Sequence, residues 1–400
     1  MALFRQEERK EPAQRDLGGD GQAVAATDGT TLCTSNEDDL TVVVAPRISI
    51  SKSRPPRTAR EETAKECGWQ VGHIAVSNGE MVLLRVISPL GMGSLGVVEE
   101  VASIEPGYKT FVRKRVPLPY YYRRQRLRII KEEAKVLEEL SHLHIVQIIG
   151  SYEETSQAGR SFYSLLMAPV GDDDLKTFLD MVGDQNPAPA REWNWLRQWF
   201  TCLISAVAYF HEHGVRHQDI KPSNIIHRGS NIYFTDFSSA SQIEIGQTTS
   251  TETPARTSAM YAASEVVKYL QNGTTLQRHG LGADIFSLGG VFMEILTVID
   301  GRLVGDFHRF LQDLPLVAST ESLGQRSHSA RGILLHSKVL QRCSLWFKAS
   351  NLVFSRNVFE ECILPMLQRN RQERPSAVSV LRLFRMIDPL VFSCPCFSFG

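Results

Sequence analysis

The sequence predicts an α+β fold in which a strand-rich part is followed by a helix-rich part. Between residues 75 and 170, short runs alternate apolar and polar residues with the period of a strand, and one amphipathic helix interrupts them. After residue 175, long segments repeat apolar residues every three or four positions, which is the period of a helix. The 400 residues contain no internal repeat.

The strand-rich part contains five strand candidates, at 79–87, 96–103, 109–116, 144–154 and 160–170. Its helix at 123–143 has one apolar face, made of Leu127, Ile130, Ala134, Leu137 and Leu140. The basic run at 120–131 predicts the solvated face of this helix, with an acidic partner or nucleic acid as the alternative.

The helix-rich part begins with a predicted helix at 191–214 that Gly214 caps. Its apolar stripe consists of Leu196, Trp199, Phe200, Leu203, Val207 and Phe210. Residues 282–297 are apolar nearly all round, which predicts a helix buried in a large core. That segment is too short for a membrane span and carries Asp284 and Glu294.

Composition excludes several classes of protein. Hydrophobic residues make up 42% and charged residues 22%, as in ordinary globular proteins. Lys plus Arg (44) equals Asp plus Glu (44), so net charge attracts neither nucleic acid nor a membrane, and we expect neither partner. No signal peptide is recognisable, and the 7 cysteines form no CxxC pair. We therefore expect reduced thiols and a soluble protein of the cytoplasm or nucleus.

The ends of the chain predict tails. Residues 1–70 are rich in small, charged and Pro residues, which predicts disorder, although the run at 40–51 is apolar enough for a strand. A docking or regulatory role is the alternative to disorder without function. Residues 391–400 form a short tail that matches no C-a-a-X ending.

The first motif that could bind a ligand is a glycine-rich turn. "GMGSLGVV" places Gly91, Gly93 and Gly96 in a G-x-G-x-x-G pattern, and glycines allow backbone N–H groups to approach phosphate. A structural turn is an equally good explanation of the glycines alone. A dinucleotide-binding loop would need a helix after them, whereas "VVEEVAS" alternates like a strand. This strand–glycine–strand pattern resembles the glycine-rich loop of protein kinases.

Further kinase-like motifs follow in the expected order. They are "FVRKRV", "HQDIKPSN" (217–224), "TDFS" (235–238), "MYAASE" (260–265), "ADIFSLGG" (283–290) and "RQERPSA" (371–377). From about 75 to 390 the chain resembles the eukaryotic protein kinase superfamily, serine/threonine type. The resemblance implies a bilobal fold with an N-lobe at 75–168, a hinge at 168–172 and a C-lobe at 173–390. Two stretches further resemble serine/threonine kinases of filamentous fungi.

The resemblance also implies roles for polar residues. Asp219 would accept the proton of the substrate hydroxyl, and Lys221 would offset charge on the transferred phosphate. Asn224 and Asp236 would hold Mg²⁺, which prefers hard oxygen ligands.

The remaining site residues would bind ATP. Lys114 would hold the phosphates with Glu133 as its ion-pair partner, and Met167 would stand at the entrance to the adenine pocket, before the hinge. The other predicted contacts are Leu90, Gly91, Met92, Gly93, Ser94, Leu95, Gly96, Val97, Val98, Val112, Ala168 and Val170. The partners implied are ATP, Mg²⁺ and protein substrates.

Several positions depart from the family pattern. Gln218 replaces the Arg that pairs with a phosphorylated activation loop, which predicts activity without phosphorylation of the loop hydroxyls at 238–262. Ser238 and Ser264 replace a Gly and a Pro, Val112 replaces a smaller Ala, and Phe286 replaces a Trp. An active kinase and a pseudokinase scaffold are both compatible with these changes. The retained Lys114, Asp219 and Asp236 favour the active enzyme; a small-molecule kinase is a weaker alternative.

Overall fold

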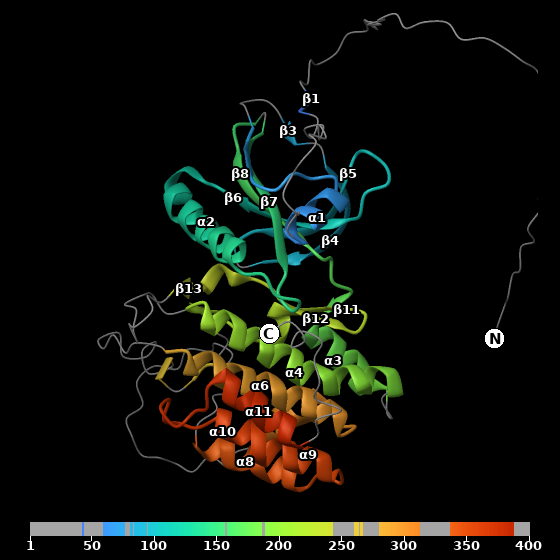
Figure 1. Cartoon of the computed structure of the whole chain (residues 1–400), viewed down its shortest axis with the longest axis vertical. Coiled ribbons are helices and arrows are strands. Elements are labelled where there is room, and N and C mark those ends of the chain that lie inside the picture. Colours follow the sequence, from blue (N-terminus) through green and yellow to red (C-terminus); the bar gives the residue numbers. More distant parts are fainter. Residues whose placement is uncertain are drawn as a thin grey trace, which may run out of the picture. The chain divides into compact units, whose positions relative to one another are not determined.

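The computed structural model describes residues 42–43, 59–76, 81–82, 84–93, 95–156, 158–185, 189–242, 260–263, 265–266, 280–312 and 337–387. All of these residues belong to one compact unit, 41–400. A sheet with helix α2 (Arg123–Glu139) beside it is followed along the chain by a helical layer, so the predicted α+β class is confirmed (Figure 1).

The sheet of the N-lobe has six strands in the order β2-β7-β8-β6-β5-β4. The strands are β2 (His73–Ala75), β4 (Leu84–Met92), β5 (Val97–Ser103), β6 (Phe111–Pro117), β7 (Gln147–Thr155) and β8 (Ser161–Ala168). Adjacent strands from β7 to β4 pair antiparallel, and the glycine-rich turn joins β4 to β5. The sheet is antiparallel except at one edge, where β2 pairs parallel with β7. The short β1 (Val42–Val43) and β3 (Met81–Val82) also pair parallel.

Both faces of this sheet are buried at its central strands β6, β7 and β8, although alternating sequences usually indicate one solvated face. On the inner face, Val112, Leu165 and Met167 join the main core with the apolar side of α2. On the outer face, their neighbours Phe111 and Leu166 join a second core. Strand residues alternate between the two faces. One set of alternate residues therefore packs in the main core and the other set packs in the second core.

The cover of the outer face comes from a segment that the sequence predicted to be disordered. Within 1–70, that prediction is wrong for 59–70, because α1 (Ala59–Glu66) lies against β7 and places Ala64, Cys67 and Trp69 in the second core. Trp69 is only 5% exposed, and its ring lies 6.0 Å from that of Tyr152. The ordered kinase-like unit therefore starts before residue 75.

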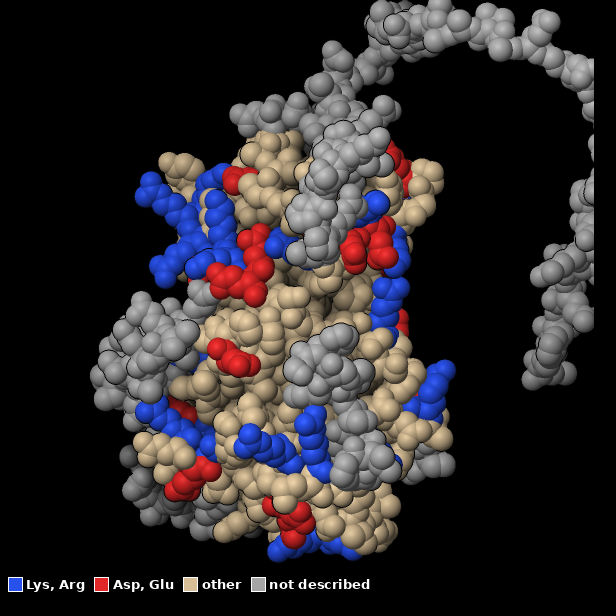
Figure 2. All heavy atoms as spheres, viewed as in Figure 1, with Lys and Arg blue, Asp and Glu red and all other residues tan. Residues whose placement is uncertain are grey.

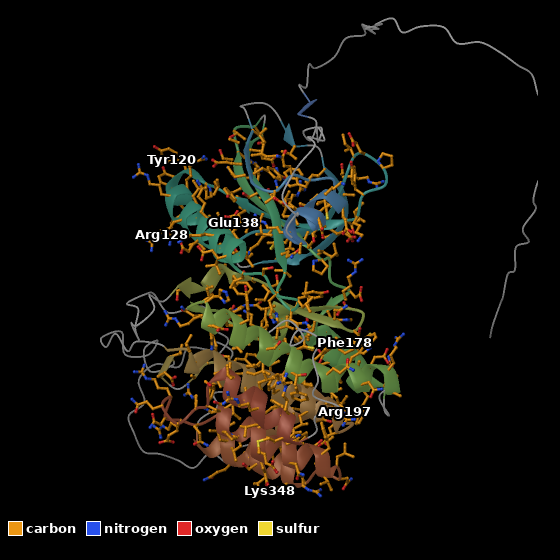
Figure 3. The ribbon with its side chains drawn as sticks, viewed as in Figure 1. Tyr120, Arg128, Glu138, Phe178, Arg197 and Lys348 are labelled. Atoms are coloured by element: carbon orange, nitrogen blue, oxygen red, sulfur yellow. The ribbon has the colours of Figure 1, made fainter. Side chains whose placement is uncertain are left out.

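The outer side of α2 is basic. Figure 2 shows Lys and Arg gathered over this helix, and Figure 3 shows Tyr120 and Arg128 directed away from the sheet. Arg123 pairs with Glu153, whereas Arg124 and Arg128 are exposed. The exposure agrees with the predicted solvated face, but the tyrosines form a separate 3₁₀ turn, η1 (Tyr120–Tyr122), before the helix begins.

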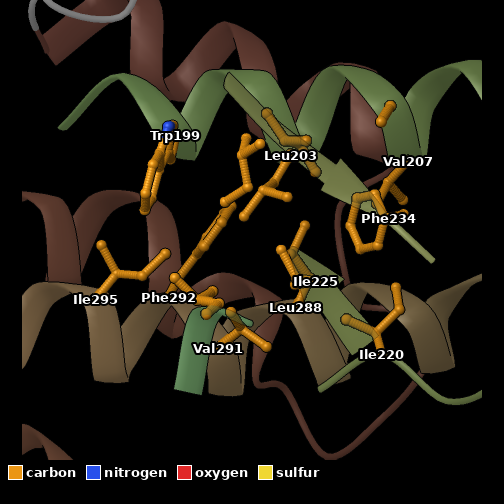
Figure 4. Packing of buried hydrophobic residues seen from close by; sticks show 14 of the residues in the cluster. Trp199, Leu203, Val207, Ile220, Ile225, Phe234, Leu288, Val291, Phe292 and Ile295 are labelled. Atoms are coloured by element: carbon orange, nitrogen blue, oxygen red, sulfur yellow. The ribbon is translucent and has the colours of Figure 1, made fainter. Parts of the chain in front are cut away.

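The C-lobe is built around α4 (Ala190–Glu212) and α6 (Gly282–Ile299). All six residues of the predicted stripe on α4 are fully buried, and Gly214 follows that helix at a φ of 70°. Figure 4 shows Trp199 and Leu203 of α4 facing Leu288 and Phe292 of α6. Among the described helices, α6 is long and apolar enough to span a membrane, but 89% of it is buried inside the protein, as in a core helix.

Small strands and further helices complete the C-lobe. A three-stranded sheet has the order β12-β11-β9, and β10 pairs with β13. The strands are β9 (Asp173–Asp174), β10 (Val215–Arg216), β11 (Ile225–Arg228), β12 (Asn231–Phe234) and β13 (Ser241–Gln242), with turns η2 (Pro222–Asn224) and η3 (Phe237–Ser239). The helices are α3 (Leu175–Asp184), α7 (Val304–Gln312), α8 (Ser337–Lys348), α9 (Val353–Asn357), the π-helical η4 (Val358–Ile363), α10 (Leu364–Met366) and α11 (Ala377–Ile387).

Replacing Trp69 by Ala tests the second core. We expect Trp69→Ala to lower the free energy of unfolding by about 3–5 kcal/mol, because a buried ring leaves a cavity. Urea unfolding followed by circular dichroism measures the loss. Tyr121→Ala is the control, since Tyr121 is 90% exposed and its loss should cost less than about 0.5 kcal/mol. Equal effects of the two substitutions would show that 59–76 does not stabilise the sheet.

Candidate active site

Lys114 lies between two carboxylates that come from different parts of the chain. From β6, its Nζ donates to both carboxylate oxygens of Glu133 on α2, at 2.8 and 2.9 Å. It also donates to Oδ1 of Asp236, which follows β12, at 2.7 Å. The predicted pair of Lys114 and Glu133 is therefore present, and Asp236 joins it. Lys114 and Glu133 are 2% and 1% exposed, so solvent screens these contacts little.

Burial and charge act against each other in this cluster. Burial lowers the pKa of Lys114, but the carboxylates of Glu133 and Asp236 outweigh it and the pKa lies above its ordinary value. Burial raises the pKa of Glu133 to about 7, against the charge of Lys114. Burial also acts to raise the pKa of Asp236, yet the charge and hydrogen bond of Lys114 lower it to about 2. Asp236 is thus the carboxylate that stays ionised.

A second polar group forms around Asp219. Its Oδ2 accepts from Nζ of Lys221 at 2.8 Å and from Nδ2 of Asn224 at 3.0 Å. Asn224 Nδ2 also donates to the backbone oxygen of Asp219 at 2.9 Å. Oδ1 of Asp219 is buried and has no hydrogen-bond partner among the described residues. One carboxylate oxygen is therefore held in place, and the other remains available as an acceptor.

The loop that carries Asp219 is anchored from α6. Asp284 accepts from the backbone N–H groups of His217 and Gln218, each at 2.9 Å. Its Oδ2 also lies 3.0 Å from Nε2 of His211 at the end of α4. Gln218 has a φ of 65°, a left-handed conformation that costs energy without such support. Nothing in the sequence around His211 signals this contact.

Backbone contacts bring the two polar groups together. The N–H of Thr235, which precedes Asp236, donates to the backbone oxygen of Asn224 at 3.0 Å. Nε2 of His217 lies 3.1 Å from the backbone oxygen of Thr235. Phe237 is buried, and its ring lies 4.6 Å from that of His217. The predicted residues 114, 219, 224 and 236 thus belong to one connected site.

The predicted adenine-pocket residues lie partly in the main core. Val112 of β6 pairs with Met167 of β8, and both are buried. Leu95, Val98 and Val170 are partly buried against the same core, and Ala168 belongs to the second core. Three residues of the glycine-rich hairpin are instead exposed, namely Leu90 at 43%, Met92 at 81% and Val97 at 38%. Ser94 lies outside the described residues.

One glycine of the loop, Gly96, has a steric reason, and Gly93 lies close to Lys114. The N–H of Gly93 donates to the oxygen of Gly96 at 2.8 Å, which closes the turn. A Cβ on Gly96 would lie 2.1 Å from the backbone oxygen of Arg115, so only glycine fits there. A Cβ on Gly93 would lie 3.7 Å from Cε of Lys114. The loop therefore lies directly over the stem of Lys114.

Comparison with known proteins identifies the family. The family model described as "Protein kinase domain" matches residues 84–383. The chain belongs to the protein kinase family. The match covers most of the predicted domain of 75–390 and includes every polar residue of the site.

Relatives of this kinase are similar at low identity. It is 24% identical over 62% of its length to the mitogen-activated protein kinase kinase kinase ANP1 of Arabidopsis thaliana, covering 33% of that protein. It is 29% identical over 57% of its length to the serine/threonine-protein kinase PrkC of Bacillus subtilis, covering 32% of it, and 28% identical over 64% to mitogen-activated protein kinase 13 of Oryza sativa, covering 49%. The chain thus spans about a third to a half of these relatives. The predicted serine/threonine type is confirmed at the level of the family, and the fungal likeness stays a prediction.

Departures from the family pattern have local contacts. The Ser238 hydroxyl forms a hydrogen bond with Asp236 that a Gly could not supply and that lowers the pKa of Asp236, after the larger effects of burial and Lys114. Glu265 and Arg374, from the motifs "MYAASE" and "RQERPSA", form an ion pair at 2.7 and 2.9 Å. The Arg374 guanidinium also lies 4.9 Å from the ring centre of Phe286, which stands at the usual Trp position. Ser264 and the loop hydroxyls at 248–258 lie outside the described residues.

The polar residues fit Mg²⁺ with few protein ligands. Asn224 uses its amide nitrogen on Asp219, which reserves the amide oxygen for a metal, and Asp236 supplies an ionised carboxylate. No group of three or more His, Cys, Asp or Glu residues is placed for a metal in the described part of the chain. Mg²⁺ in kinases is typically held by few protein oxygens plus phosphate oxygens and water, so two ligands suffice.

The raised pKa of Glu133 predicts a dependence of stability on pH. The folded value of about 7 exceeds the ordinary 4.5, so the folded state binds more protons between these values. Stability due to this group is full below about 4.5 and is lost as the pH rises through about 7. We expect the free energy of unfolding of the ligand-free protein, relative to Glu133→Gln, to fall by about 1–3 kcal/mol between roughly pH 5 and 8.

Urea unfolding of the parent and of Glu133→Gln at several pH values measures this difference. Glu132→Gln is the matched control, because Glu132 is the exposed neighbour on α2. A parent-minus-variant difference that stays constant across the pH range would contradict the proton uptake by Glu133.

Proposed function

We propose that this kinase transfers the γ-phosphate of ATP to serine or threonine hydroxyls of protein substrates. The observation that carries the proposal is the state of Asp219. Lys221 and Asn224 hold its Oδ2, while Oδ1 is buried without a partner among the described residues. An ionised carboxylate held in this way can accept the proton of an incoming hydroxyl.

Each polar residue has a defined part in this transfer. The hydroxyl oxygen forms a bond to the γ-phosphorus, the bond from that phosphorus to the β–γ bridging oxygen breaks, and the hydroxyl proton passes to Asp219. Lys221 offsets charge on the transferred group, and Lys114 holds the other phosphates. Mg²⁺, when bound by Asn224 and Asp236, neutralises phosphate charge.

The residues that chemistry needs favour an active enzyme over a scaffold. Lys114, Asp219 and Asp236 are all present and all connected by hydrogen bonds. A pseudokinase that binds nucleotide without transfer is the second candidate, and the substitutions at 218, 238 and 264 are the reason to keep it.

Substrate class and location are part of the proposal. The sequence "HQDIKPSN" resembles the serine/threonine branch, which favours these acceptors over tyrosine. The described cysteines 67, 343 and 362 are buried and form no disulfide with one another, which supports a reducing compartment such as the cytoplasm or nucleus.

A transfer assay tests the proposal. The purified full-length chain is incubated with γ-labelled ATP, Mg²⁺ and a basic protein substrate. We expect label on serine and threonine, and a loss of at least about 100-fold in Asp219→Asn and Lys114→Met, because each removes a group that acts on the reacting phosphate or hydroxyl.

An exposed ion pair, Lys176 and Asp180, supplies the control variants for this assay. Lys176→Met and Asp180→Asn repeat the two substitutions on a surface pair whose side chains are 66% and 52% exposed, and both should retain transfer. Nucleotide binding without any transfer by the parent would favour the scaffold. Label confined to tyrosine would overturn the acceptor class.

A further inference from the structure

Two side chains at the start of the loop that carries Asp219 donate hydrogen bonds to one hydroxyl. Arg216 in β10 donates through Nη2 to Oγ of Ser241 in β13 at 2.8 Å. Gln218 donates through Nε2 to the same oxygen. Arg216 and Ser241 are only 1% and 4% exposed, so this contact is shielded from water. We call these three residues the Ser241 node.

The Ser241 node lies at one end of the segment that carries Asp236. The backbone pairs Arg216 with Ser241 directly, so side chain and main chain reinforce each other. Ser241 follows Asp236 by five residues, across the turn η3. The segment is held at its other end by Phe234, whose backbone bonds to His144 at 2.9 Å and to Val146 at 3.1 Å.

Asp236 itself depends on this support. Its φ of 56° and ψ of 67° place it in the left-handed region, which a non-glycine residue occupies only when its surroundings impose it. Movement of Ser241 would release η3 and, with it, the orientation of the Asp236 carboxylate. A buried guanidinium suits this task, because its hydrogen bonds are strong and directional.

We propose that Arg216 is a positioning residue for Asp236 and acts through Ser241, in the place of the Arg missing at 218. The inference rests on the proposed function, in which Asp236 holds Mg²⁺. The family's Arg at position 218 would bind a phosphate. In this chain the positive charge lies two residues earlier, at Arg216, and binds the Ser241 hydroxyl. The hydrogen bonds of the node join unmodified side chains, so they do not depend on phosphorylation of the loop.

The experiment measures the Mg²⁺ concentration that gives half-maximal binding of a fluorescent ADP analogue. This readout needs no phosphate transfer, so it remains decisive if the proposed function fails in the transfer assay. We expect Arg216→Met to raise the Mg²⁺ requirement about tenfold, from the loss of a charge-assisted hydrogen bond. Arg216→Lys should restore part of the loss. Hydrogen exchange should rise at 236–242 in the Met variant.

A double-mutant cycle separates positioning from general destabilisation. If Arg216 acts through Ser241, then Arg216→Met combined with Ser241→Ala should raise the requirement no further than Ser241→Ala alone. Arg228→Met, at an exposed position at the end of β11, is the matched control and should leave it unchanged. Additive effects, or an unchanged Mg²⁺ requirement in folded Arg216→Met, would overturn the proposal. If Arg216→Met does not fold, Ser241→Ala alone must show the rise.

Treatment of the parent with phosphatase, with dephosphorylation checked by mass, supplies a further arm. The Mg²⁺ requirement should stay the same, because the hydrogen bonds that hold Ser241 come from Arg216 and Gln218 and not from a phosphate. A several-fold increase after treatment would mean that a phosphate on the loop positions Asp236 instead.

Discussion

The contact of Lys114 with two carboxylates links the N-lobe to the C-lobe. Its partners are Glu133 on α2 and Asp236 after β12, so β6, the helix and the segment that carries Asp236 meet at one ammonium group. The buried cluster holds two acidic groups and one basic group. Burying such an excess of negative charge is costly, and burial therefore raises the pKa of Glu133. The pKa of Asp236 falls instead, because the charge and hydrogen bond of Lys114 outweigh burial there. A divalent cation beside Asp236 would balance the cluster, so the ligand-free site is already disposed to bind one.

Sequence reasoning succeeded where function depends on short spacing. Asp219, Lys221 and Asn224 lie within one loop, and their mutual hydrogen bonds follow from that local arrangement. Sequence reasoning failed where interacting residues lie far apart in the chain, or where a few apolar residues stand in a polar stretch. The contact of His211 with Asp284 joins residues far apart in sequence, and neither residue type signals it. Trp69 lies in a polar stretch whose average composition indicates disorder, yet together with Ala64 and Cys67 it covers part of a sheet face.

The second core changes how the N-lobe is delimited. Met167, the last residue before the hinge on the inner face, belongs to the main core, whereas its neighbour Ala168 belongs to the second core. The strand that leads into the hinge is therefore held from both sides, on one by α2 and on the other by the segment at 59–76. Gly150 shows how close that cover is, since a Cβ there would lie 2.2 Å from Nε1 of Trp69. A catalytic fragment cut at residue 75 would keep every polar residue of the site and lose half of what supports the hinge strand.

Two departures from the family pattern, Gln218 and Ser238, act on one segment and in one direction. Ser238 adds a hydrogen bond to Asp236, and Gln218 with Arg216 adds two to Ser241. Each is a bond that the usual Gly, or an Arg directed at a phosphate, would not make. A segment held at several points loses the freedom to change between states and keeps its metal ligand in place. Under the proposed function, Lys114, Asp219 and Asp236 are retained while Gln218 and Ser238 add bonds to this segment, which is the pattern expected of a kinase whose control lies outside it.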